Sequence, residues 1–325
     1  MTVLAVRHVT DYTYDASVEW AHHAACLAPR DTPWQRVRGW RLAITPAPDG
    51  WALSSGLGTP ALDIGEVERR LWQDPWGNRH LVFGHARVHE HLRVESRFEV
   101  ELQPRPAADP QRGPAWEAVA ELLRYQAGRA LQAADEFALA SPFAAPDATL
   151  AVYARRAFPR GRLLAAGGVA LMRQIHTDLR YRPHSTTVAT RAADALAQRS
   201  GVCQDFAHVF IAACRALGLA ARYVSGYLLT RPAPGTTRLV GADASHAWAE
   251  LWCPEQGWLA LDPTNNIPAD LDHVTLAWGR DYADVAPLRG VVRGGGEATL
   301  RVGVTVEPVV PVASVARGSP GSPAA

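Results

Sequence analysis

Residues 1–103 show the alternation of apolar and polar side chains that is typical of β-strands. Every second residue of LAVRHVTDYTY (4–14) falls on one face, and β-branched and aromatic residues are abundant. Further strands are predicted at 37–46 and 79–102, and DPWGN (74–78) supplies a turn before the second of them. The pattern therefore predicts a β-rich N-terminal domain over residues 1–103.

After this region, apolar residues recur at the spacing of amphipathic helices. Residues 103–114 (QPRPAADPQRGP) are Pro-rich and polar, so residues 104–160 are assigned to a linker and a helical segment. Helices are predicted over four stretches, which are 115–133, 147–157, 162–180 and about 190–199. The last of these helices leads directly into a segment that contains a cysteine.

A further helix is predicted to begin at this cysteine, Cys203. Apolar residues recur at helical spacing at Phe206, Phe210, Ala213 and Leu217, and Gly218 then provides a C-terminal stop. At a helix N-terminus, unpaired N–H groups and the helix dipole favour a thiolate over a thiol, and the same N–H groups can hold an oxyanion. His208 lies roughly 140° around the helix axis from Cys203. It is therefore excluded as the base for this thiol.

Two predicted strands farther along the chain carry a histidine and an aspartate. Residues 244–252 (ASHAWAELW) and 258–262 (WLALD) alternate, and the turn-like segment CPEQG (253–257) joins them into an antiparallel hairpin. Their parity places His246 and Asp262 opposite or diagonal to each other on one face. A carboxylate in that position would fix the tautomer of the imidazole and stabilise the imidazolium.

Three segments, GVCQDFAH, ASHAWAE and GWLALDPTN, resemble in order, spacing and flanking residues the motifs of the transglutaminase-like superfamily of papain-related thiol enzymes. The N-terminal part, through HVT, LAPR and DPWGN, also resembles the β-rich region that precedes the core in many bacterial members. The resemblance implies an α+β fold with a papain-like core over residues 161–307, in which helices pack on an antiparallel sheet. It also implies a closing β-hairpin (VVRGGGEATLRVGVTV) that turns at residues 294–296.

By the same resemblance, Cys203 corresponds to the nucleophile, His246 to the general base and acid, and Asp262 to the orienting carboxylate. The expected reaction is attack on an amide carbonyl through a thioester acyl-enzyme. We expect hydrolysis of a peptide, isopeptide or glutamine-type amide, because nothing resembles the calcium-binding acidic loops of animal crosslinking enzymes. The alternatives are a transglutaminase that transfers the acyl group to an amine, and a catalytically silent peptide-binding module.

Three further residues are candidates for supporting or substrate-binding roles. Gln204 follows the nucleophile and is a candidate to face the cleft, and Thr186 lies in a loop that would shape the cleft entrance. Trp248 shares the predicted hairpin face with His246. It either lines an acyl-binding cleft or packs in the core.

The composition indicates an ordinary globular protein, with 48% hydrophobic and 20% charged residues and a net charge of +1. No block of Lys and Arg marks a surface for nucleic acid or for anionic membranes, so neither is an expected partner. The resemblance implies a peptide or protein substrate. His85, His89 and His91 alternate with charged residues and are interpreted as part of a solvated strand face. No metal and no cofactor are therefore expected, and the oligomeric state stays open.

The start of the chain, MTVLAVRHVTDYTYD, lacks a basic segment followed by an apolar run, and no stretch reaches eighteen apolar residues. A cytoplasmic location is therefore expected. Four cysteines without metal-ligand spacing agree with free thiols in a reducing compartment. Residues 308–325 contain mostly Pro, Ala, Ser and Gly and are predicted to be a disordered tail.

Overall fold

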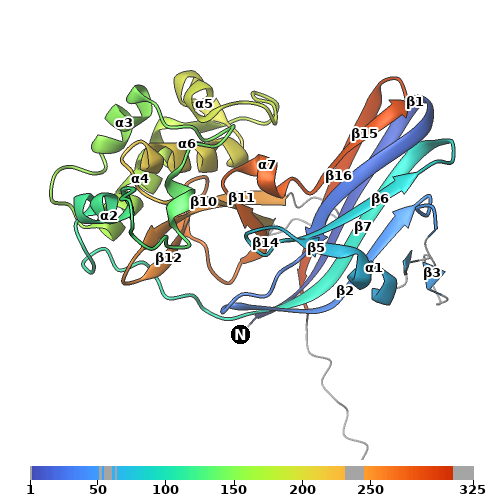
Figure 1. Cartoon of the computed structure of the whole chain (residues 1–325), viewed down its shortest axis with the longest axis horizontal. Helices are drawn as coiled ribbons and strands as arrows, with labels where there is room; N and C mark the ends of the chain where they lie inside the picture. The colour runs from blue at the N-terminus through green and yellow to red at the C-terminus, as the bar shows by residue number, and fades with distance from the viewer. Residues whose placement is uncertain (1, 51–52, 55–60, 63, 231–244, 310–325) are drawn as a thin grey trace, which may run out of the picture.

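The computed structural model describes residues 2–50, 53–54, 61–62, 64–230 and 245–309. Two antiparallel sheets lie side by side, and most of the helices gather around the smaller sheet, away from the larger one (Figure 1). No helix in these ranges has the length and apolar character needed to cross a membrane.

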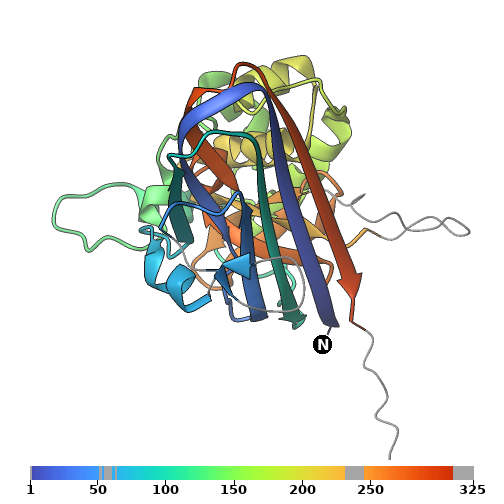
Figure 2. The same ribbon diagram turned by 90° about the vertical axis from the view of Figure 1, so that its right-hand side faces the viewer.

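The larger sheet is built from both ends of the chain. Its strands are β1 (Thr2–Ala28), β2 (Gln35–Thr45), β5 (Leu71–Gln73), β6 (Arg79–His85), β7 (His89–Leu102), β15 (Leu288–Gly294) and β16 (Ala298–Pro308). The order is β2-β7-β1-β6-β5, and β15 and β16 both pair with β1. Figure 2 shows these long strands running alongside one another. A two-stranded sheet of β3 (Leu53–Ser54) and β4 (Ala61–Leu62) and helix α1 (Ile64–Arg70) complete this N-terminal part.

The predicted closing hairpin of the catalytic core is wrong in its pairing. The chain bends at residues 294–296, where all three glycines have positive φ, but β15 and β16 pair with β1 and belong to the N-terminal sheet. β15 and β16 follow β1 one after the other in the same antiparallel direction, since Val18 lies opposite Gly294 and Tyr14 lies opposite Ala298. The glycine-rich segment was visible in the sequence, but the chain only bends there, and β15 and β16 do not pair with each other as a hairpin would. The choice of partner strand depends on surfaces at the other end of the chain.

The smaller sheet has the order β13-β12-β11-β10-β14, and its neighbours are all antiparallel. Its strands are β10 (Ala221–Leu228), β11 (Ser245–Cys253), β12 (Gly257–Asp262), β13 (Ile267–Pro268) and β14 (His273–Gly279). The predicted hairpin of 244–262 is therefore present as β11 and β12. Two short segments, β8 (Arg180–Tyr181) and β9 (Ser200–Gly201), form a separate parallel pair.

The helices surround one central helix, α6 (Cys203–Arg215), in which every residue after the first is buried. The others are α2 (Trp116–Leu123), α3 (Ala148–Arg155), α4 (Leu164–Asp178), α5 (Ala192–Gln198), α7 (Tyr282–Val285) and the 3₁₀ turn η1 (Asp135–Ala138). The helix predicted over 115–133 ends at Leu123 instead. Leu131 is exposed and Gly128 has positive φ, so the apolar spacing there does not reflect a buried helical face.

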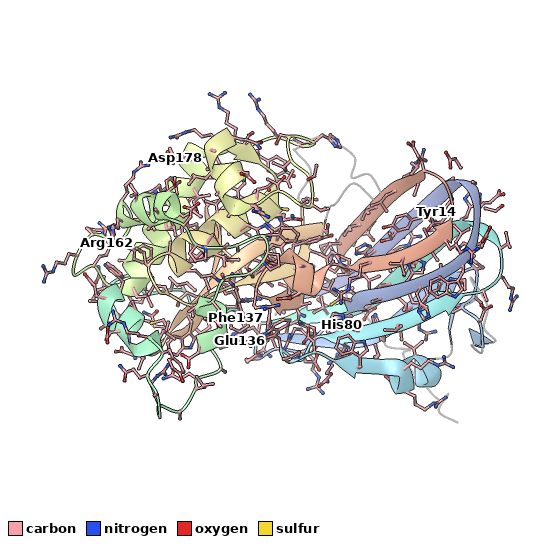
Figure 3. All side chains as sticks on the ribbon, turned by 45° about the horizontal axis from the view of Figure 1, so that its top comes forward. Tyr14, His80, Glu136, Phe137, Arg162 and Asp178 are labelled. Atoms are coloured by element: carbon pink, nitrogen blue, oxygen red, sulfur yellow. The ribbon has the colours of Figure 1, made fainter. Side chains whose placement is uncertain are left out.

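Side-chain amides join the two sheets at the edge strand β14. Gln35 donates to the carbonyl of Thr275 at 2.7 Å and accepts from its N–H at 2.8 Å. Asn78 makes the same pair of contacts with the backbone of Trp278, at 2.7 and 3.0 Å. Figure 3 places Glu136, Phe137 and His80 near the same boundary. These contacts satisfy the backbone of an edge strand and fix the N-terminal sheet against the smaller one.

Candidate active site

Cys203 is the first residue of α6, as predicted, and the residues before and after it fix its position. The Asp205 carboxylate accepts the N–H of Val202 at 2.7 Å and the hydroxyl of Thr186 at 2.6 Å. The first of these bonds satisfies a donor at the helix N-terminus. Gly201 permits this cap, because a Cβ there would lie 2.5 Å from an Asp205 oxygen. Cys203 is half-buried and lines a cavity, whereas the rest of the helix is buried.

His246 and Asp262 come together on one face of the β11–β12 hairpin. Ala249 lies opposite Leu261, so Asp262 is diagonal to His246 across the two strands. The Nε2 atom of His246 donates to Asp262 Oδ2 at 2.8 Å. The Cys203 side chain is close enough to contribute to raising the pKa of this imidazole, and both residues line one cavity. The three predicted residues therefore lie together, with the imidazole hydrogen-bonded to the carboxylate.

Asp262 is fully buried and is surrounded by hydrogen-bond donors. Its Oδ1 accepts the backbone N–H groups of Thr264 and Asn265 at 2.9 and 3.2 Å. Its Oδ2 accepts His246, the Asn265 amide at 2.7 Å and His273 Nε2 at 3.2 Å. Burial alone would raise the pKa of this carboxyl group, but the two imidazoles and the Asn265 amide outweigh burial and lower it. Asp262 is therefore held as an anion.

The anion at Asp262 changes the protonation of His246. Burial disfavours the imidazolium, but the hydrogen bond to Asp262 and the interactions with Cys203 outweigh it and raise the pKa of His246 to about 10. At neutral pH, this histidine therefore holds a proton beside the sulfur. An imidazolium in that place can stabilise a thiolate and can later give its proton to a leaving amine.

His273 and Asn265 take part in this network, and the sequence did not assign a role to either. His273 Nδ1 accepts the backbone N–H of Asp270 at 3.4 Å, so its Nε2 carries the hydrogen that is donated to Asp262. Burial lowers the pKa of His273, which keeps it a neutral donor. Asn265 was visible within the motif GWLALDPTN. No sequence signal distinguishes His273, since its role depends on strand β14 lying beside β10.

His246, Asp262 and His273 are close enough to hold a metal ion, because their ligand atoms lie within 4.8 Å of one another. Both imidazoles, however, already donate their Nε2 hydrogens to one carboxylate oxygen. The lone pair of His273 points the other way, at the backbone N–H of Asp270. The donor set therefore fits a hydrogen-bonded network better than it fits metal ligation.

Cys203 and His246 both line a cavity of about 590 Å³ at the boundary between the two sheets. One side of the cavity is formed by Tyr223 of β10, Tyr282 of α7 and Gln204 of α6. The other side is formed by residues of the N-terminal sheet, which are His8, Thr10, Tyr12, Arg289, Leu300 and Val302. The N-terminal sheet therefore supplies a large part of the surface that a bound substrate would touch.

The structure separates the three supporting candidates. Gln204 lines the cavity and donates to the carbonyl of Val188 at 3.1 Å, so it holds one wall in place. Thr186 does not line the cavity and instead binds Asp205 beneath the start of α6. Trp248 is fully buried and packs edge-on against His273, with ring centroids 5.2 Å apart. Of the two interpretations of Trp248, core packing is the one observed.

Comparison with known proteins agrees with these motifs. The family model of the transglutaminase-like superfamily matches residues 163–263, and that of the bacterial transglutaminase-like N-terminal region matches residues 4–54. An uncharacterized protein of Mycobacterium tuberculosis (strain H37Rv) is 39% identical over 313 residues, which are 93% of this chain and 92% of that protein. A protein-glutamine gamma-glutamyltransferase of Pseudomonas aeruginosa is 40% identical over 95 residues, which are 28% of this chain and 14% of that protein.

Among solved structures, a candidate cysteine protease from Cytophaga hutchinsonii has a TM-score of 0.72 at 20% identity, over 95% of this chain and 91% of that chain. This likeness shows a shared fold. The chain belongs to the transglutaminase-like superfamily. The predicted fold class, a papain-like α+β core preceded by a β-rich N-terminal region, is confirmed.

Proposed function

We propose that this protein is a thiol enzyme that cleaves an amide bond of a peptide or protein through an acyl-enzyme on Cys203. The observation that carries the proposal is the geometry at Cys203. A half-buried thiol lies at the N-terminus of α6, next to an imidazole that is hydrogen-bonded to a buried carboxylate. Such an arrangement is the requirement for an activated nucleophile.

In the first half of the reaction, the Cys203 thiolate attacks the amide carbonyl and forms a C–S bond. The oxyanion lies near the first N–H groups of α6, which have no partner within the helix. His246 then gives its proton to the amine as the C–N bond breaks, and a thioester remains. Asp262 holds the imidazole in one orientation throughout, through the bond of 2.8 Å to Nε2.

In the second half, neutral His246 takes a proton from the attacking group, and the C–S bond breaks to return the thiolate. Water as the attacking group gives hydrolysis, which we favour, because nothing in the sequence resembles the calcium-binding acidic loops of animal crosslinking enzymes. A second candidate is transfer to an amine. It is supported by the local similarity to a protein named protein-glutamine gamma-glutamyltransferase, 40% identical over 95 residues.

The nucleophile is tested by intact-mass measurement of alkylation with sub-stoichiometric iodoacetamide from pH 5 to 8. We expect Cys203 to react before the buried Cys26, Cys214 and Cys253, and to lose this preference in His246→Ala. His91→Ala, an exposed histidine on the other sheet, is the matched control and should behave as the wild type. Slow alkylation spread over several cysteines would contradict the proposal and favour a catalytically silent peptide-binding module.

The reaction itself is tested with glutamine-containing peptides, with and without an added alkylamine. Hydrolysis predicts ammonia release and a product heavier by about one mass unit in both cases, whereas transfer predicts an amine adduct when the amine is present. Cys203→Ala should abolish both products. Undiminished amide cleavage by this variant would rule out Cys203 as the nucleophile.

A further inference from the structure

The cavity at Cys203 has an unusual charge distribution. Among the described residues that line it, Arg289 is the one side chain with a fixed charge, and none is an aspartate or glutamate. Arg289 is therefore the one fixed positive charge on the described wall of the cavity, and Cys203, His246 and the Asp262 anion behind them form a separate hydrogen-bonded group.

Arg289 is near the start of β15, opposite Ala24 of β1, so it belongs to the N-terminal sheet. Its Nη1 makes a long contact of 3.5 Å with the carbonyl of Ala283. No carboxylate among the described residues pairs with it. Arg293, four residues later on the same strand, differs in this respect, because it forms an ion pair with Glu19 at 3.0 Å.

The histidine that the N-terminal sheet contributes to the cavity is already hydrogen-bonded at both ring nitrogens. His8 has one ring nitrogen 2.9 Å from the Tyr227 hydroxyl and the other 3.1 Å from Thr10 Oγ1. Burial lowers the pKa of His8 to about 4, so it is neutral. The remaining wall includes tyrosines and aliphatic side chains. A guanidinium at the rim of a cavity whose described wall holds no carboxylate favours an anionic ligand there.

We propose that the acyl donor carries a free carboxylate and that Arg289 binds it, so that the site selects acidic amide substrates over neutral ones. A guanidinium offers two parallel N–H donors that match the oxygens of a carboxylate. The carboxylate is either the C-terminal group of a short peptide or the side chain of a neighbouring acidic residue. This inference rests on the proposed function, since it concerns the substrate of the same cavity.

The first test uses two small probes of Cys203. Iodoacetate and iodoacetamide both alkylate a thiolate at a CH₂ group with loss of iodide, and they differ in having a carboxylate or a neutral amide. The ratio of their rates at Cys203 therefore reports the positive potential of the cavity. We expect Arg289→Gln to lower this ratio about fivefold or more at low ionic strength, and added salt to narrow the difference. Arg293→Gln is the matched control and should keep the wild-type ratio.

The outcomes distinguish this inference from the proposed function. If Cys203 reacts preferentially but Arg289→Gln leaves the ratio unchanged, the role of Arg289 is wrong and the nucleophile stands. If Cys203 has no preferential reactivity in the wild type, the proposed function fails and this inference fails with it. Because Arg289 is exposed, circular dichroism should show Arg289→Gln to be folded.

The second test identifies the source of the carboxylate by calorimetry with Cys203→Ala, which binds without turnover. Three glutamine peptides are compared, one blocked and neutral, one with a free C-terminal carboxylate, and one blocked with a neighbouring glutamate. We expect one of the two acidic peptides to bind at least about fivefold more tightly than the neutral one. In the double variant Cys203→Ala/Arg289→Gln, the acidic and neutral peptides should bind with equal affinity. Equal binding of all three, or a difference that survives this substitution, would overturn the proposal.

Discussion

Each of the two sheets contains a carboxylate at the centre of a hydrogen-bond network, but the two networks differ in their donors. Glu95 on β7 accepts Arg7 at 2.8 Å and Arg93 at 3.3 Å, and it also accepts Arg97. The three guanidinium side chains are 35, 43 and 56% exposed. Asp262 on β12 is 0% exposed, and two of its donors are imidazoles that are also buried.

The difference shows which kind of network can take part in proton transfer. Arginine stays protonated at all ordinary pH values, so the partners of Glu95 hold fixed charges on a wet surface and stabilise the sheet at most weakly. Histidine exchanges its proton near neutrality, and in a dry site its pKa depends strongly on the neighbouring carboxylate. The network at Asp262 therefore controls a proton, whereas the network at Glu95 is structural.

The comparison predicts its largest effect for Asp262→Asn. An amide cannot carry the charge that stabilises the His246 imidazolium, and its N–H groups would face the Nε2 hydrogens of both histidines. We expect kcat/KM for amide cleavage to fall by about 10³-fold or more, as measured by initial rates on a folded protein. Glu95→Gln in the same assay should stay within about twofold of wild type. Similar losses in the two variants would remove the distinction between the networks.

His273 is predicted to have a smaller effect, because it acts through Asp262. His273→Leu removes one donor to the carboxylate, which corresponds to about 1 to 2 kcal/mol and therefore to roughly a five- to thirtyfold loss in kcat. KM should change little. His273→Gln keeps an N–H donor and should recover part of the loss. If Leu and Gln at this position behave alike, both in kcat and in the pH profile of Cys203 alkylation, His273 serves packing only.

The protonation of His246 predicts how stability depends on pH. Its pKa in the folded protein is about 10, above the value of about 6.5 for an unfolded chain. The stability it contributes is fully present below pH 6.5 and is lost as pH rises through the folded value. Urea unfolding should therefore show a larger difference between wild type and His246→Gln at pH 6 than at pH 10. A difference that stays constant or grows with pH would contradict the charged pair.

Glu95→Gln is expected to give the smallest effect. Glu95 is itself buried, but its three arginine partners are partly exposed to water, so the free energy of unfolding should fall by no more than about 1 kcal/mol. Because Debye screening acts on exposed charges, about 1 M salt should reduce this difference further. Urea unfolding at low and high salt measures both quantities. A larger loss that does not respond to salt would mean that the burial of Glu95 outweighs the exposure of its arginine partners.

Much of the candidate site was predictable because its signals are local in the sequence. The start of α6 at Cys203 follows from apolar spacing within the helix. The meeting of His246 and Asp262 follows from strand parity and the short turn between β11 and β12, which together leave few possible registers. The sequence was a poorer guide to which neighbouring side chains line the cavity. Thr186 was expected at the cleft entrance but binds Asp205. For Trp248 the sequence left cleft lining and core packing open, and the side chain packs in the core.

The sequence by itself determined where the nucleophile helix begins, which hairpin carries the histidine and the aspartate, and which superfamily the chain resembles. These depend on residues within a few turns or one hairpin of each other. The tertiary structure alone decided that His273 donates to Asp262, that β15 and β16 pair with β1, and that Arg289 lines the cavity. Each of these contacts joins segments from different elements. The contacts form only when the folded elements pack against each other, so no local sequence pattern predicts them.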